Sequence, residues 1–315
     1  MKVLIVGFGS IGRRHFQSFK RVRPELDIAL LRRKDSLAAP GFEQVQAFYD
    51  LPSAAKYQPD LVCICTPSQS HLADLNALLP LAPNIFVEKP LITTLEDAKA
   101  VEALFERSSS KFFYGCVMRF HPLLFRLRQI VVDRTYGKAL TYRIECGSYL
   151  PDWRPMQDYR KLYSAEAASG GVALDLIHEF DYAQWCFGEI QALTGLRSRV
   201  SSLEINSEDL CVATATHKTG TSGGISLNYF QPVPSRSCTA IFENAVVETN
   251  LLTGNLCIRE KSASEKNENH FIEREAMFDL QSRELFETIE SNLPSKWNVA
   301  SAVTLVKDVL SIKII

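Results

Sequence analysis

The sequence lacks a long apolar run, an excess of either charge and a leader signature, and each absence excludes a class of protein. No stretch approaches the roughly 18 apolar residues that span a bilayer, and the opening MKVLIVG lacks the length and cleavage site of a signal peptide. The 35 basic and 36 acidic residues give a formal net charge of -1, without the basic excess of a nucleic-acid surface. We expect no membrane and no nucleic acid among its partners.

Closely spaced cysteines of the Cys-x-x-Cys type are also missing. The eight cysteines are scattered, which argues against a disulfide framework and against a structural zinc site. Cys63 and Cys65 lie in an apolar, strand-like run, where a reduced thiol behaves as a small hydrophobe. These observations predict reduced thiols, no bound metal and a cytoplasmic protein. The length of 315 residues, with 46% hydrophobic residues, allows two folded domains.

A glycine fingerprint follows the first predicted strand. The run Lys2–Val6 leads into GFGSIG, and a helical pattern follows, which is the context in which Gly-x-Gly-x-x-Gly indicates a dinucleotide site. The first glycine permits a tight turn, the second the approach of a pyrophosphate, and the third the packing of helix on strand. A glycine-rich turn without a ligand is the alternative. The predicted cofactor contacts in this motif are Gly7, Phe8, Gly9, Ser10, Ile11 and Gly12.

The second predicted strand, Asp27–Asp35, ends among basic residues. An NAD site usually ends this strand with an acid, whereas Arg32, Arg33 and Lys34 suit a 2′-phosphate by charge and by guanidinium geometry. A solvated basic loop is the alternative, and Asp35 just beyond keeps NAD open. We predict NADP or NAD as cofactor, with a preference for NADP.

Strands and helices then alternate up to residue 119. Apolar runs at Asp60–Cys65, Asn84–Pro90 and Lys111–Phe120 are separated by helical patterns. This order predicts an α/β domain, a doubly wound parallel sheet of the Rossmann type, with ligands at the carboxyl ends of its strands. We assign residues 1–119 to this dinucleotide-binding domain.

From residue 120 the pattern changes to strand-rich pieces, residues 139–149, 222–230 and 245–260. They predict a C-terminal α+β domain, residues 120–315, built on a largely antiparallel open sheet. We expect this domain to bind the substrate and to form the contacts between subunits. Its last helix, about residues 298–315, is a candidate to pack on the first domain.

One predicted helix of the second domain, Val172–Phe187, places ionisable groups among apolar ones and stops at Gly188. Burying Asp175 and His178 without partners would be costly, so they either pair or line a cavity. An aspartate that gains from the helix dipole and a satisfied core histidine are the alternative. Because a cofactor domain lies upstream, we favour the cavity.

These landmarks together resemble the glucose–fructose oxidoreductase/inositol dehydrogenase family (Gfo/Idh/MocA). The motifs that carry the resemblance are GFGSIG, TPSQSH, VEKP, MRFHP and GGVALDLIHEFDYAQWCFG, between residues 7 and 188. The resemblance implies an NAD(P)-dependent oxidoreductase that acts on CH–OH groups of a sugar, nucleotide-sugar or cyclitol. It also implies a homodimer or homotetramer that assembles through the C-terminal sheet.

The family assigns roles to individual residues. Its Glu-Lys-Pro lysine, here Lys89, lies between nicotinamide and substrate, and a helical pair, here Asp175 and His178, completes the catalytic set. The family commonly spaces that pair four apart, whereas the spacing here is three. The remaining predicted cofactor contacts are Cys65, Thr66, Pro67, His71, Glu88 and Lys89. The predicted substrate contacts are Arg119, Tyr149, Trp153, Arg160, Asp175 and His178.

Alternatives stay open for several of these residues and for the reaction. Glu88 either faces the cofactor or fixes its neighbour, and His71 either reaches the nicotinamide ribose or only caps a helix. The polar-aromatic cluster of residues 149–160 is either a sugar site or a surface loop.

For a dehydrogenase, His178 would exchange the hydroxyl proton and Lys89 would polarise the oxyanion or relay that proton. A nicotinamide-dependent glycosidase and a catalytically silent cofactor-binding sensor are the alternative functions.

Overall fold

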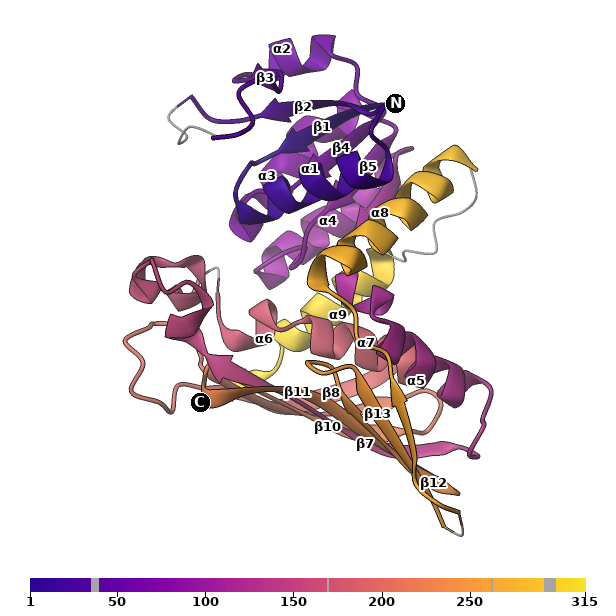
Figure 1. Cartoon of the computed structure of the whole chain (residues 1–315). Helices are drawn as coiled ribbons and strands as arrows, with labels where there is room; N and C mark the ends of the chain where they lie inside the picture. Colours follow the sequence, from indigo (N-terminus) through magenta and orange to yellow (C-terminus); the bar gives the residue numbers. More distant parts are fainter. Residues whose placement is uncertain (35–39, 169, 262, 292–298) are drawn as a thin grey trace. The chain divides into compact units, whose positions relative to one another are not determined.

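A computed structural model describes residues 1–34, 40–168, 170–261, 263–291 and 299–315. The chain forms two compact units (Figure 1). The first contains Met1–Val117 and Arg274–Thr304, and the second contains Met118–Glu273 and Leu305–Ile315. The sequence pattern assigns residues 274–304 to the second domain, whereas in the structure they belong to the first unit.

The first unit is built on six parallel strands. Their order, β3-β2-β1-β4-β5-β6, is that of a doubly wound dinucleotide-binding sheet, which confirms the prediction. The central strands β1, β4 and β5 are almost wholly buried, as expected for a parallel sheet covered on both faces. The strands are β1 (Lys2–Val6), β2 (Asp27–Leu31), β3 (Ala47–Phe48), β4 (Leu61–Ile64), β5 (Asn84–Val87) and β6 (Lys111–Tyr114).

Helices from both ends of the chain flank this sheet. The late helix α8 lies along α1 (Figure 1), where the Ser18 and Ser282 hydroxyls are 2.8 Å apart and Arg21 binds Asp279 through both carboxylate oxygens. The predicted strand Lys111–Phe120 ends early, at Tyr114, and continues as a 3₁₀ turn. The helices are α1 (Ser10–Val22), α2 (Leu51–Lys56), α3 (His71–Leu78), α4 (Leu95–Arg107) and α8 (Arg274–Glu290), with short 3₁₀ turns at Ser68–Ser70 and Leu79–Leu81.

The second unit contains a nine-stranded sheet in the order β14-β13-β12-β11-β7-β10-β9-β8-β15. Six of its eight strand pairings are antiparallel, which confirms the predicted sheet type. The strands are β7 (Ala139–Tyr149), β8 (Ile190–Ser198), β9 (Leu210–His217), β10 (Ser222–Asn228), β11 (Phe230–Phe242), β12 (Ala245–Asn250), β13 (Asn255–Glu260), β14 (Lys266–Asn269) and β15 (Lys313–Ile314).

Helices α5 (Pro122–Val132), α6 (Val172–Asp175) and α7 (His178–Phe187) lie on one face of this sheet (Figure 1). Along β9 and β10 buried residues alternate with more exposed ones, so a single face carries the core. Short 3₁₀ turns follow or precede these elements at Val117–Phe120, Leu150–Trp153, Tyr159–Lys161 and Tyr163–Ala165.

The last helix, α9 (Val299–Leu310), is shorter than predicted. It begins in the first unit and ends in the second, and the chain then adds β15 to the edge of the second sheet beside β8. Residue 298, the predicted start, lies outside the described residues.

The predicted continuous helix Val172–Phe187 is wrong, because the helix is interrupted at Leu176 and Ile177. The N–H of Ile177 bonds to the carbonyl of Leu174, and that of Glu179 to Leu176, so the turn is tightened to an i to i−3 pattern. Apolar residues face inward on both sides of the break. The apolar periodicity therefore continues across it, and the break cannot be predicted from the sequence pattern.

All eight cysteines lie among the described residues and form no disulfide there, and seven of them are buried. Of the helices in the described ranges, none combines the length and the apolar character needed to cross a bilayer.

Candidate functional site

The loop between β1 and α1 is shaped by two glycines that the fold requires. Gly7 has φ +82°, and a Cβ there would lie 2.9 Å from the carbonyl oxygen of Cys65. A Cβ on Gly12 would lie 2.3 Å from the carbonyl oxygen of Gly7, which no side chain can occupy. These two positions therefore fix the tight turn and the close packing of α1 on the sheet.

Gly9 differs from its neighbours, because no atom of the described residues lies within 4 Å of a Cβ built on it. Its backbone is extended, with φ -76° and ψ -161°, and no side chain caps the helix that it precedes. The part of the chain that the structure describes thus gives no steric reason for glycine here. Open space beside uncapped helical N–H groups fits a pyrophosphate, which needs close backbone approach and a positive dipole end.

The end of β2 presents the predicted basic residues. Arg32 is half-buried and its N–H bonds to the carbonyl of Phe48, while Arg33 and Lys34 are exposed. Asp35, the acidic residue that would allow NAD as the cofactor, lies outside the described residues.

The segment after β4 contains Cys65, Thr66, Pro67 and His71. His71 is fully buried, and its ring nitrogens face the carbonyl oxygens of Thr66, at 3.0 Å, and Leu91, at 3.3 Å. Burial lowers the pKa of this imidazole. The side chain predicted to contact the cofactor therefore holds the loop instead, while Thr66 donates to Asp74 at 2.5 Å.

Glu88 and Lys89 follow the end of β5. Oε1 of Glu88 lies 2.6 Å from Nε2 of His15, and Oε2 accepts the backbone N–H of Lys89 at 3.0 Å. Both carboxylate oxygens are therefore engaged within the unit, which favours the alternative that Glu88 fixes its neighbour over a cofactor contact. The Lys89 side chain is half-buried.

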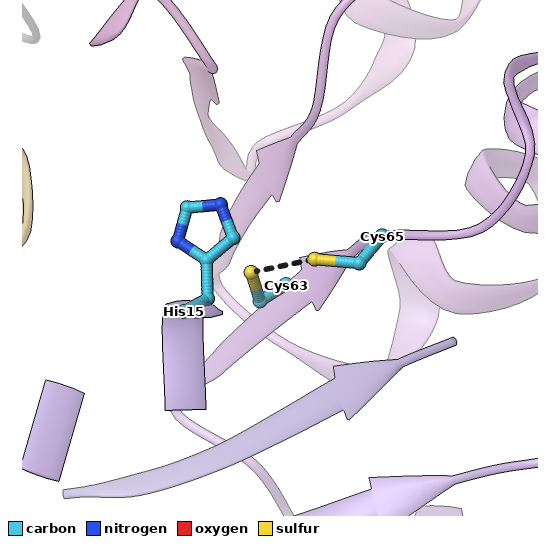
Figure 2. A group of neighbouring side chains, drawn as sticks. All are labelled: His15, Cys63 and Cys65. Atoms are coloured by element: carbon cyan, nitrogen blue, oxygen red, sulfur yellow. Dashed lines mark hydrogen bonds between the residues drawn. The ribbon is translucent and has the colours of Figure 1, made fainter. Parts of the chain in front are cut away.

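A potential metal-binding group lies beside this pair. Figure 2 shows the imidazole of His15 next to Cys63, with Cys65 beyond, and the donor atoms of all three lie within 4.8 Å of one another. Nε2 of His15 is already bonded to Glu88, and burial raises the pKa of the Cys65 thiol well above its usual value, which disfavours the thiolate that metals bind. We therefore assign these side chains to the packed interior.

In the second unit, Asp175 is buried and bonded to the sheet. Its Oδ2 accepts the hydroxyl of Tyr229 at 2.6 Å. Burial, followed by the charge of Asp175, raises the pKa values of Tyr229 and Tyr163 above the usual range. Both phenols thus stay protonated and can donate. The ring of Trp153 packs edge-on against Tyr229, with 5.4 Å between centroids.

His178 begins α7, directly after the interruption that follows Asp175, and it is half-buried. The two residues therefore belong to different helices of the same unit rather than to adjacent turns of one helix. The single helical face on which the sequence predicts both side chains is therefore interrupted between them.

The other acids of this segment have buried ion pairs. Glu179, at 0% side-chain exposure, lies 2.6 Å from Nε of Arg236. Asp181 binds Arg119 through two bonds of 2.7 and 2.9 Å. Arg119, predicted to contact the substrate, thus neutralises Asp181. Pairing accounts for most of the ionisable groups in this apolar segment.

The remaining predicted substrate contacts are at least partly exposed. Trp153 is 37% exposed and Tyr149 40%, and the indole N–H donates to the Ser148 hydroxyl at 2.7 Å. The Arg160 guanidinium binds Asp158 and Glu204 on the surface.

Sequence reasoning missed the partners that hold these groups, namely His15, Tyr163, Tyr229 and Arg236. For His15 a signal existed, since it lies on the inward face of α1 one turn after Gly12. No local pattern marks Tyr229, which pairs with a residue 54 positions away.

Two family models match the chain. An oxidoreductase family with an NAD-binding Rossmann fold matches residues 1–116, and the C-terminal domain of the GFO/IDH/MocA proteins matches residues 125–248. The chain belongs to the Gfo/Idh/MocA oxidoreductase family. The resemblance inferred from the motifs is thereby confirmed.

Similarity to an individual relative is lower and covers only part of the chain. A myo-inositol 2-dehydrogenase of Thermotoga maritima is 27% identical over 194 residues, which are 60% of this chain and 55% of that protein. The chain thus spans about half the length of this curated relative.

Two solved structures share the fold at full length. A levoglucosan dehydrogenase in complex with NADH has a TM-score of 0.87 at 14% identity, covering 98% of this chain and 95% of the other. A UDP-N-acetylglucosamine 3-dehydrogenase from Acidithiobacillus ferrooxidans has a TM-score of 0.80 at 17% identity, covering 99% and 96%.

Proposed function

We propose that this protein transfers a hydride between a nicotinamide cofactor and a hydroxyl or carbonyl carbon of a sugar, nucleotide-sugar or cyclitol. Membership of an NAD-binding oxidoreductase family supports the reaction class. Relatives named for myo-inositol and for UDP-N-acetylglucosamine support the substrate class. The observation that carries the proposal is the open space at Gly9, beside the uncapped start of α1.

When bound, the nicotinamide supplies or accepts the hydride. The protein must then remove or supply the hydroxyl proton, and we assign this task to Lys89 and His178. An ammonium group stabilises a developing oxyanion, while an imidazole exchanges a proton near neutral pH. We assign Asp175, whose Oδ2 accepts the hydroxyl of Tyr229, to orient an imidazole or a substrate hydroxyl.

We further propose a preference for NADP over NAD. Arg33 and Lys34 are exposed after β2, where a 2′-phosphate binds in related folds. Replacing Arg33 by Ser should lower kcat/KM for NADPH by about tenfold and leave that for NADH within about twofold. Equal losses with both cofactors would contradict the preference.

The deciding experiment is a spectrophotometric screen of cofactor reduction, with NAD and NADP, against sugars, nucleotide-sugars and cyclitols.

Lys89→Met should abolish turnover and leave NADH binding, measured by NADH fluorescence, nearly unchanged. Comparable loss of both would make Lys89 a binding group and our assignment wrong. Release of a chromogenic aglycone without net reduction would identify the glycosidase. Cofactor binding without either activity would identify the sensor.

We also propose a homodimer or homotetramer formed through the sheet of the second unit. On the face opposite the core, exposed residues such as Val212 and Ile241 lie on strands that also carry threonines and serines, and such a face can be covered by a second copy. Light scattering of the purified protein tests this, and replacing Val212 by Lys should shift the mass toward the monomer.

A further inference from the structure

A buried polar contact joins two elements of the first unit that carry candidate chemistry. α1 starts at the proposed phosphate site, and Lys89 follows the end of β5. Between them, Nε2 of His15 lies 2.6 Å from Oε1 of Glu88. His15 is 1% exposed and Glu88 7%, so the contact is sealed from water.

Glu88 transmits this contact to the backbone of Lys89. Its Oε2 accepts the Lys89 N–H at 3.0 Å, while its own N–H continues the strand ladder to the carbonyl of Ile64. A Cβ on Gly115 would lie 3.0 Å from the carboxylate carbon, so the glycine leaves the room that the carboxylate needs. The carboxylate is thus oriented by an imidazole, an amide and a neighbouring strand end.

Packing against aromatic rings holds the imidazole of His15 in place, in addition to its bond to Glu88. The rings of Phe19, Phe86 and Phe278 have their centroids 5.6, 5.0 and 5.4 Å from it. Within the described residues, its Nδ1 is buried and has no hydrogen-bond partner. The polar function of the side chain is therefore directed at Glu88 alone.

The two groups favour each other's charged forms. Burial opposes the imidazolium, but Cys63 and Glu88 together raise the pKa of His15, against a smaller opposing effect of Arg14. Burial also opposes the carboxylate, but His15 and Lys89 lower the pKa of Glu88. Such a pair adds little stability compared with apolar side chains of similar volume, so stability alone does not account for it.

We propose that His15 is a positioning residue, which orients Glu88 and, through it, the backbone of Lys89 relative to the helix start that receives the cofactor phosphates. The inference rests on the proposed role of Lys89. It adds to that role a second residue, 73 positions from Glu88, that acts without touching substrate or cofactor.

The test compares His15→Gln, the apolar pair His15→Phe/Glu88→Met, and the matched control His217→Gln. His217 is another buried histidine, bonded to Tyr142 and to the carbonyl of Gly188 in the second unit, with no place in the proposed chemistry. For each variant we would measure the melting midpoint, amide exchange at Lys89 by NMR, NADH binding by fluorescence, and kcat and KM with the alcohol found in the screen.

The apolar pair should fold with a melting midpoint close to that of the parent, because no buried charge is left unpaired. Exchange of the Lys89 amide should accelerate about tenfold, and kcat should fall about a hundredfold, while the KM for cofactor changes less than about threefold. His15→Gln, which keeps a donor for Glu88, should recover most of kcat. His217→Gln should lower the melting midpoint and leave kcat and Lys89 exchange unchanged.

Unchanged Lys89 exchange and unchanged kcat in the apolar pair would show that His15 and Glu88 are structural only, and would overturn the proposal. Full turnover in Lys89→Met would instead overturn the proposed function. Because the two failures occur in different variants, they can be told apart.

Discussion

The two units present their candidate chemistry by opposite means. In the first unit, the candidate ligand site is formed by backbone and open space. Among the described residues, no atom lies within 4 Å of a Cβ built on Gly9, and no side chain caps the start of α1. In the second unit, the candidate groups are side chains bound into the fold, as Asp175 is bound to Tyr229. Binding and stability are therefore separable by mutation in the first unit and coupled in the second.

The buried acids show the same difference. Glu88 has an imidazole partner, His15, which loses its charge when the pH rises above its folded pKa. Glu179 has a guanidinium partner, Arg236, which keeps its charge at every accessible pH. We therefore expect the buried pair of the first unit to respond to pH and that of the second unit to remain constant.

The largest effect is expected from breaking the second-unit ion pair. Arg236→Met leaves the Glu179 carboxylate, at 0% exposure, without its cation and should cost about 3–5 kcal/mol of unfolding free energy, measured in urea. Arg126→Met is the control, because its partner Glu268 is 30% exposed, and it should cost about 0–1 kcal/mol. Equal losses in the two variants would contradict the burial argument.

The next prediction compares two buried tyrosines, Tyr229, which is bonded to the candidate catalytic acid Asp175, and Tyr142, which is not. Tyr229→Phe removes the donor to Asp175 and should cost about 1–3 kcal/mol, together with a clear loss of kcat. Tyr142→Phe removes a similarly buried phenol, bonded to His217, and should lower stability by a similar amount without changing kcat. Both are read from urea unfolding and steady-state kinetics. Equal kcat values for the two variants would argue against a role for Asp175.

The sequence predicts the strands well and the contacts at the site poorly, for a physical reason. Apolar runs such as Lys2–Val6 and residues 139–149 reflect local burial, and both match observed strands. The glycine motif is local as well. The bond between His15 and Glu88 joins residues 73 positions apart, and no periodicity encodes such a pairing.

The same limit explains why the sequence did not show the bonding partners of other predicted site residues. Arg119 and His71 occupy positions where the chain order places ligand contacts, but their bonds to Asp181 and to Thr66 and Leu91 are set by tertiary packing. The interruption after Asp175 is equally invisible, because both flanking helices keep an apolar inward side.

A smaller effect concerns pH. Although burial opposes it, the pKa of His15 is raised above 6.5, so its contribution is complete below pH 6.5 and is lost as pH rises through the folded value. The pKa of Glu88 is lowered below 4.5 despite burial, so its contribution is complete above pH 4.5 and is lost on acidification.

The His15–Glu88 pair therefore contributes fully between pH 4.5 and 6.5. The stability difference between the parent and His15→Phe/Glu88→Met should favour the parent most in this window and shrink toward alkaline pH. Urea unfolding across the pH range measures it. The corresponding difference for Arg236→Leu/Glu179→Leu should stay constant over the neutral and alkaline range, and a parallel decline in both would remove the distinction between the units.

The smallest effect on stability, with a large effect on binding, is expected at Gly9. A Cβ there lies more than 4 Å from every atom that the structure describes outside the neighbouring residues, so Gly9→Ala should change the unfolding free energy by less than about 1 kcal/mol. The added methyl group would occupy the space proposed for the pyrophosphate and should weaken NADH binding, read by fluorescence, about tenfold or more. Gly12→Ala, whose Cβ would lie 2.3 Å from the Gly7 carbonyl oxygen, should instead cost about 1–3 kcal/mol. If Gly9→Ala bound NADH as the parent does, the open space would not be a ligand site. The contrast between backbone and open space in the first unit and bonded side chains in the second would then lose its functional meaning.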